Sequence, residues 1–155
     1  MSDPALEIRR CRADESPALE LVDAMVAEME PLYGRIDVPA APSAGPDEMW
    51  PPRGSFVVVV RSEEPIACGG VKALGEGAVE IKRMYVVPDQ RGRGVAGYLL
   101  RALEDEARTH GFTIARLDTG PKQPHAQRIY EAAGYRAIGN FNDNPFASFW
   151  GEKAL

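Results

Sequence analysis

The fold is decided by one short, basic, glycine-rich stretch, Arg91-Gly92-Arg93-Gly94-Val95-Ala96. An apolar segment, residues 78–87, precedes it, and helical periodicity begins at Val95. A turn that leads from a strand into a helix presents unpaired backbone N–H groups and a partial positive charge. Glycines keep side chains away from those donors, and the two arginines add full charges. The stretch therefore predicts a site for a multiply charged phosphate ligand.

Upstream of this turn, three apolar segments follow one another at residues 55–61, 65–74 and 78–87. Their short connectors permit hairpins and are too short for helical crossovers. Residues 6–10 alternate apolar and polar side chains and predict a further strand. The first half of the sheet is therefore predicted to be an antiparallel meander.

Helical spacing predicts three helices: residues 14–29, a helix from Val95 to a stop at Gly111, and a helix from Gln123-Pro124 to a stop at Gly134. Further strands are predicted at residues 112–119, 135–138 and 148–153. The helix at Val95 makes a crossover, so residues 78–87 and 112–119 should lie parallel. The prediction is an α/β (α+β) fold: a mixed, mostly antiparallel sheet of about seven strands, with helices on both faces, in one domain of residues 1–155.

Composition narrows the function classes. The 155 residues carry 18 basic and 23 acidic side chains, a net charge of −5, which disfavours a nucleic-acid partner. No segment has the length of a membrane span, and the N-terminus lacks signal-peptide features, so we expect a cytoplasmic location and no membrane partner. Cys11 and Cys68 have no metal-ligand spacing, so no metal is expected. Six prolines between residues 31 and 52 predict a long loop, either part of a binding site or a disordered connector.

Residues 92–97 also satisfy the dinucleotide fingerprint G-x-G-x-x-G, and Asp118 follows at about the distance of a ribose-binding acid. A doubly wound domain, however, normally carries this fingerprint in its first strand-to-helix turn and needs several crossovers. Here the fingerprint follows three hairpin-linked strands, so the dinucleotide interpretation is the weaker one.

Residues 80–88 together with residues 91–96 resemble the central motif of the GNAT superfamily of acyl-CoA N-acetyltransferases. Residues 117–120 and 126–135 resemble that family's second motif, a helix with a tyrosine and a glycine-aromatic ending. The resemblance implies acetyl-CoA as co-substrate and a mechanism of direct attack in a ternary complex. An acyl-CoA sensor without catalysis would use the same pocket and remains an alternative.

The family geometry implies which residues hold the donor. The backbone of Met84, Tyr85 and Val86 would lie along the pantetheine arm, with the Met84 N–H facing the thioester oxygen. The amides of residues 91–96 would hold the pyrophosphate. Gln123 stands where many relatives carry an asparagine near CoA.

Two catalytic roles follow from the resemblance and from the chemistry. An alkyl amine is mostly protonated at neutral pH, so a base is needed, and Glu80 lies where related enzymes keep a glutamate. Period-two alternation predicts that Glu80 and Met84 share one face of their strand. Tyr130 would protonate the departing thiolate. The alternatives are a Glu80 that pairs with a cross-strand cation and a Tyr130 that is only a core residue.

The acceptor is expected to be a primary amine of a small molecule or a peptide, and a homodimer is possible. The acceptor site is expected between the proline-rich loop and residues 141–149. Its candidate walls are Tyr33, Trp50, Phe141, Phe146 and Trp150.

Overall fold

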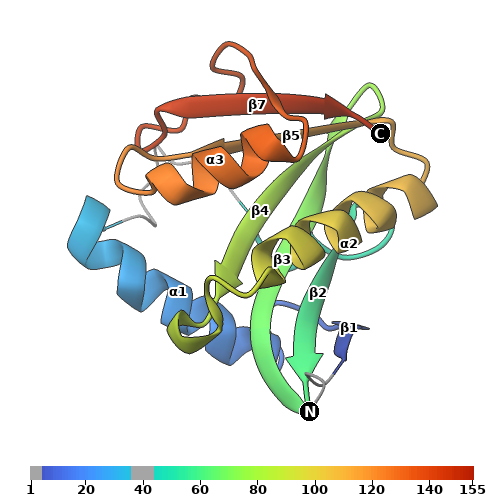
Figure 1. Ribbon diagram of the computed structural model, residues 1–155. Coiled ribbons are helices and arrows are strands. Elements are labelled where there is room, and N and C mark those ends of the chain that lie inside the picture. The colour runs from blue at the N-terminus through green and yellow to red at the C-terminus, as the bar shows by residue number, and fades with distance from the viewer. Residues whose placement is uncertain (1–4, 36–43) are drawn as a thin grey trace.

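The computed structural model describes residues 5–35 and 44–155, which form one mixed sheet with three α-helices (Figure 1). The strands are β1 (Leu6–Arg10), β2 (Gly54–Arg61), β3 (Glu64–Gly75), β4 (Ala78–Val86), β5 (Ile114–Thr119), β6 (Arg136–Ala137) and β7 (Phe149–Ala154). Their order in the sheet is β1-β2-β3-β4-β5-β7-β6. Among these described strands only β4 and β5 pair in parallel. The predicted fold class is confirmed, and a doubly wound dinucleotide sheet is excluded.

Alternation along β2 shows that both faces of the sheet are covered. Val57 and Val59 pack into a cluster with α2 (Val95–Thr109), whereas Phe56 and Val58 pack into a second cluster with α1 (Ala18–Tyr33). This accounts for a β2 buried along almost its whole length. The third helix, α3 (Pro124–Ala132), lies on the same face as α2 (Figure 1). In the described part of the chain, no helix is long and apolar enough to cross a membrane.

Helix α1 differs from the prediction in position. It spans Ala18–Tyr33 instead of residues 14–29, begins after Pro17 without a side-chain cap, and includes Pro31. The Asp14 carboxylate, predicted as a possible cap, pairs with Arg12 instead. Tertiary contacts hold the last turn after the proline, since the Tyr33 hydroxyl accepts a hydrogen bond from the Lys122 backbone N–H at 3.0 Å.

The predicted proline-rich loop falls partly on residues 36–43, which lie outside the described residues. Of its described residues, Leu32 and Tyr33 belong to the end of α1 and line the cavity identified below, whereas residues 44–52 do not border it. Met49 is buried in the cluster on the α1 face, and Trp50 stacks beside Arg12 at 5.9 Å. Within residues 44–52, only Ala44 and Met49 are buried, and they anchor this segment to the core on the α1 face.

Strand β4 separates from β5 towards its carboxyl end but stays paired with β3 as far as Val86. It pairs with β5 only over residues 78–80, after which the two strands diverge (Figure 1). Towards β3 the ladder shifts between Cys68 and Gly70, and Arg83 adopts a positive φ of 61°. This geometry is a β-bulge, which inserts one extra residue into β4.

Candidate active site

A cavity of about 940 Å³ occupies the space where β4 and β5 diverge. One side is formed by β4 residues 81–86 and by the turn that leads into α2, and the opposite side by residues 118–120 and α3. Helix α1 contributes Met25, Glu28, Met29, Leu32 and Tyr33. The cavity therefore extends from a helix N-terminus, through an opening in the sheet, to the α1 face.

The turn at residues 91–96 has the backbone of an anion site. Gly92 and Gly94 have φ values of 76° and 81°, in the left-handed region that glycine adopts without strain. The first intrahelical bond of α2 runs from the Tyr98 N–H to the Gly94 carbonyl at 3.1 Å. Within the described chain, the N–H groups of residues 92–97 donate to no protein acceptor. Gly92, Gly94, Val95 and Ala96 line the cavity with these donors free.

The two arginines of this turn do not act alike. The Arg91 guanidinium is held by the Glu28 carboxylate of α1, at 2.8 and 2.6 Å, and its Nε donates to the Val86 carbonyl at 2.9 Å. Arg93 donates to Gln90 at 3.2 Å and is not part of the cavity wall. The sequence predicts that both arginines add full positive charges beside the amides. In the structure the charge of Arg91 is paired with Glu28, so Arg91 fixes α1 to the turn.

The bulge at Arg83 corrects a second prediction. Before it, Val79 and Ile81 face α2, so Glu80 and Lys82 face α1. After it, Met84 and Val86 pack against the α2 cluster and Tyr85 against the α1 cluster. Glu80 and Met84 thus lie on opposite faces, because the extra residue reverses the alternation. The bulge also leaves Met84 without a partner in the register with β3.

Glu80 is almost fully buried, with a relative exposure of 1%. Its Oε2 accepts a hydrogen bond from Asn142 Nδ2 at 2.7 Å and lies 3.7 Å from Lys82 Nζ. Burial raises the pKa of Glu80 above its ordinary value, and Lys82 and the Asn142 hydrogen bond only partly oppose that rise. Glu80 stands behind the cavity wall and is not part of it, so any proton it takes from a ligand must be relayed.

Asn142 joins Glu80 to a second carboxylate. The same Nδ2 donates to Asp118 Oδ2 at 2.6 Å, and Asn144 Nδ2 donates to that oxygen at 3.0 Å. The Asn142 Oδ1 accepts from the Trp150 indole N–H at 3.0 Å. Asp118 and Asn144 line the cavity. Sequence reasoning missed this network, since three asparagines at alternate positions, 140, 142 and 144, indicate only a loop.

Tyr130 lies where α3 meets the cavity, on the face of the sheet that α2 covers. Its hydroxyl is 3.8 Å from Met84 Sδ, a weak acceptor, which leaves the proton available to a ligand. Burial raises the pKa of Tyr130 to about 12, so the hydroxyl is protonated at neutral pH. The structure thus brings together Tyr130 and Met84 on one face, while Glu80 and Asp118 meet through Asn142.

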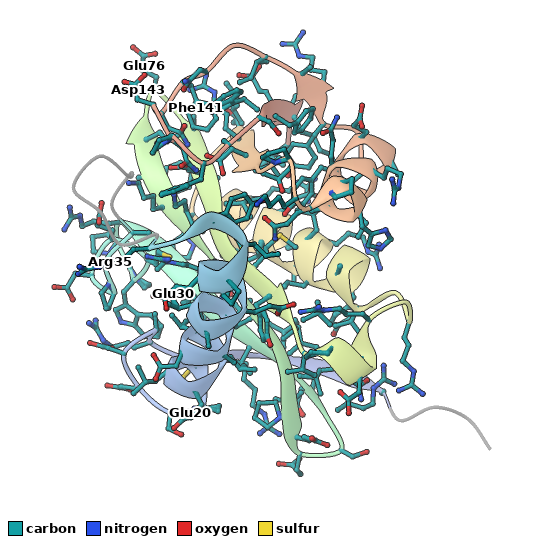
Figure 2. The ribbon with its side chains drawn as sticks, turned by 90° about the vertical axis from the view of Figure 1, so that its left-hand side faces the viewer. Glu20, Glu30, Arg35, Glu76, Phe141 and Asp143 are labelled. Carbon is teal, nitrogen blue, oxygen red and sulfur yellow. The ribbon has the colours of Figure 1, made fainter. Side chains whose placement is uncertain are left out.

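Of the five predicted acceptor walls, the structure brings two to the cavity. Tyr33 and Phe146 line it with ring centroids 6.3 Å apart. The Arg116 guanidinium lies over the Phe141 ring at 6.0 Å, and Figure 2 shows Phe141 far from Glu20 of α1. Trp50 and Trp150 also fall outside the wall. Position within the two predicted loops therefore did not indicate which aromatic rings line the cavity.

Gln123 lines the cavity as the N-cap of α3, and its Oε1 is 3.5 Å from the Tyr33 hydroxyl. Close approach of α1 to this segment depends on Gly120. A Cβ at Gly120 would lie 2.7 Å from the Phe146 carbonyl oxygen and closer still to the Tyr33 hydroxyl. The glycine therefore permits the meeting of α1, α3 and the loop before β7.

Comparisons with known proteins identify the family of this chain. The profile of the acetyltransferase (GNAT) family matches residues 20–135. An IAA acetyltransferase from Azospirillum brasilense is 33% identical over 132 residues, which cover 83% of this chain and 86% of the relative.

Solved structures show the same fold. A Klebsiella pneumoniae protein described as an acyl-CoA N-acyltransferase has a TM-score of 0.79 and 27% identity, covering 97% of each chain. A GNAT acetyltransferase from Elizabethkingia anophelis, solved with acetyl-CoA bound, has a TM-score of 0.69 and 15% identity, covering 97% of this chain and 98% of its own. The family profile covers most of this chain and the relatives match it along its length, so the chain belongs to the acetyltransferase (GNAT) family and is an acyltransferase.

Proposed function

We propose that this protein transfers an acetyl group from acetyl-CoA to a primary amine within a ternary complex. One observation carries the proposal: a single cavity joins the free amides of the turn at residues 92–97 to Tyr130 and Asp118. The donor phosphates would meet the turn amides, and the pantetheine arm would follow the unpaired edge of residues 81–86. The acceptor would enter from the α1 face, beside Asp118 and Tyr33.

In this proposal the acceptor ammonium binds at Asp118 and loses its proton through water to Glu80, which is a stronger base than an ordinary carboxylate because burial raises its pKa. The free amine attacks the thioester carbonyl, so that a C–N bond forms and the C–S bond breaks. The Met84 N–H would stabilise the developing oxyanion. Tyr130 would donate its proton to the departing thiolate, and the second proton, lost by the attacking nitrogen as the amide forms, would restore the Tyr130 hydroxyl through water.

The direct test is an amine screen with acetyl-CoA in which thiol release and acetylated product are both measured. We expect turnover with at least one class of primary amine and thermal stabilisation by acetyl-CoA. Stabilisation without turnover across the panel would favour an acyl-CoA sensor. Stabilisation by NAD and not by acetyl-CoA would overturn the proposal.

Tyr130→Phe removes the proposed acid and leaves the ring in place. We expect kcat to fall by about 10- to 100-fold, at or below the lower end of what proton transfer contributes, with little change in the Kd for CoA. Tyr135→Phe is the matched control, since its hydroxyl donates to buried Glu104 at 2.9 Å and lies outside the cavity wall. That control should lose stability and keep its kcat; equal kcat losses in both variants would mean that Tyr130 is only a core residue.

Asn142→Ala removes a donor that lowers the pKa of Glu80. The pKa of Glu80 should therefore rise further, and the acid limb of the profile of kcat/KM against pH should move to higher pH. The control is Asn140→Ala in the same loop, whose side chain accepts, among residues 5–35 and 44–155, only from the backbone N–H groups of residues 142 and 143. If the acid limb lies at the same pH in wild type and Asn142→Ala, the group whose protonation abolishes activity is not Glu80.

A further inference from the structure

Arg83 lines the cavity from the bulge of β4. Within the described residues its guanidinium makes no hydrogen bond or ion pair with another side chain, and only its backbone carbonyl is engaged, as acceptor for the Cys68 thiol. Burial lowers the pKa of Arg83, as occurs when a cation is withdrawn from water without an acidic partner. Arg83 is half-buried, and a ligand that covers it would make the charge costly to bury unless that ligand supplies an anion.

The acidic side chains of this region already have partners. Glu80 lies 3.7 Å from Lys82 Nζ, and Glu48 lies 3.4 Å from Lys72 Nζ. Asp118 accepts hydrogen bonds from two asparagine amides. Both lysine side chains are only 13% exposed, so water does little to weaken their charges. The amides that hold Asp118 are neutral, so Asp118 keeps its charge for an ammonium, and among the described residues no carboxylate acts on the Arg83 guanidinium.

This position belongs to the acceptor end of the cavity. Arg83 precedes Met84, whose N–H is assigned to the thioester oxygen, whereas the phosphate turn has its own donors at residues 92–97. An acceptor amine is itself a cation before it loses its proton, so an uncompensated guanidinium nearby would repel it. An acceptor that carries its own anionic group turns this repulsion into attraction.

We infer that the acceptor is a primary amine that also bears a carboxylate or phosphonate, with the anion bound by Arg83 and the ammonium by Asp118. The guanidinium fork suits the two oxygens of either anion. Met25, Met29 and Phe146 offer apolar contacts to the rest of the molecule, which favours amino acids with apolar side chains. The inference rests on the proposed acetyl transfer, in which the anionic group takes no part in bond making. Polyamines and aminoglycosides lack that anion.

The experiment compares three acceptors on one scaffold: L-phenylalanine, L-phenylalaninamide and the corresponding aminophosphonate. Each is assayed with acetyl-CoA, and the binding of each to the CoA complex is measured by calorimetry. Wild type should prefer the anionic acceptors over the carboxamide by about 10- to 100-fold in kcat/KM, the effect of a hydrogen-bonded charge pair. The carboxylate and phosphonate arms then show which anion fits better.

Arg83→Gln should reduce that preference to about one, and Arg83→Lys should keep part of it, because lysine keeps the charge without the fork. Comparing ratios between variants cancels the difference in amine pKa between acid and carboxamide. Arg108→Gln, which removes an arginine paired with Asp105 on the exposed side of α2, is the control and should keep the wild-type ratio.

Two results would overturn the inference: an unchanged ratio in Arg83→Gln, or a loss of CoA affinity in that variant with the ratio intact, which would place Arg83 in the donor site. If Arg83→Gln does not fold, the inference is tested by the kcat/KM ratios of anionic acceptors to the carboxamide in wild type and in Arg83→Lys. Failure of the proposed acetyl transfer looks different, because the anionic amines would still bind the CoA complex in calorimetry while no acceptor is acetylated.

Discussion

Gly94→Glu is expected to lower the affinity for CoA by at least about 100-fold, which corresponds to the loss of one or two hydrogen bonds to a charged group. Gly94 has a φ of 81° and borders the cavity at the first turn of α2. A glutamate there places bulk and like charge against the phosphates. Its backbone would also be strained by about 1 to 2 kcal/mol in this left-handed conformation. Calorimetric titration with CoA gives the affinity directly.

Two further variants separate the causes of this loss. Gly94→Ala has the backbone strain without the charge and should lose less affinity. Gly111→Glu has the same charge and nearly the same backbone, with φ 86° and open space for a side chain, but at the other end of α2. It should be destabilised and still bind CoA. Full CoA affinity in Gly94→Glu would show that the phosphates bind elsewhere.

Glu80→Gln should reduce kcat/KM by about 100-fold or more at neutral pH, within the range that a general base contributes, and should leave the Kd for CoA unchanged. The wild-type rate should fall as pH drops through the raised pKa of Glu80, because the base becomes protonated. The variant should lack that acid limb. Profiles of kcat/KM against pH for both proteins test this.

The same variant should be more stable than wild type above the pKa of Glu80. A carboxyl whose folded pKa exceeds its unfolded pKa destabilises the folded state when ionised, and wild type recovers that stability as pH falls through the folded pKa. The difference in Tm between Glu80→Gln and wild type should therefore shrink on acidification.

Glu106→Gln is the matched control for Glu80→Gln. Glu106 is a second buried carboxylate, paired with Arg10 at 2.7 Å and outside the cavity wall. It should keep full activity. Unchanged turnover in Glu80→Gln, including at low pH, would remove Glu80 from the mechanism.

The parts of this fold set by local sequence could be predicted. The short connectors correctly predicted the antiparallel meander, and Gly92 and Gly94 correctly predicted the turn and the start of α2. The position of α1 could not, because the contacts of Tyr33 and Lys122, distant in sequence, hold its last turn after Pro31. Local proline chemistry alone favours an earlier stop.

Most residues of the site could be predicted, but the faces on which they lie and the partners that hold them could not. Met84, Val86, Tyr130 and the turn glycines all reach the cavity. The pattern of residues 78–87 contains no sign of the bulge, since a positive φ at an arginine arises from how β3 and β4 pair. The link from Asn142 to Glu80 joins residues 62 positions apart and has no local signature. The pairing of Arg91 with Glu28 is similarly remote.

The bulge in β4 also determines how substitutions combine. Residues 80 and 82 face one layer of the protein, and residues 84 and 86 face the other, with the sheet between them. Sites that share no partner contribute nearly additively to free energy, whereas residues that share a network do not. Substitutions at Lys82 and Val86 should therefore add, and those at Glu80 and Asp118 should be coupled through Asn142. The one inserted residue thus divides β4 into two segments whose substitutions change the free energy of unfolding almost independently.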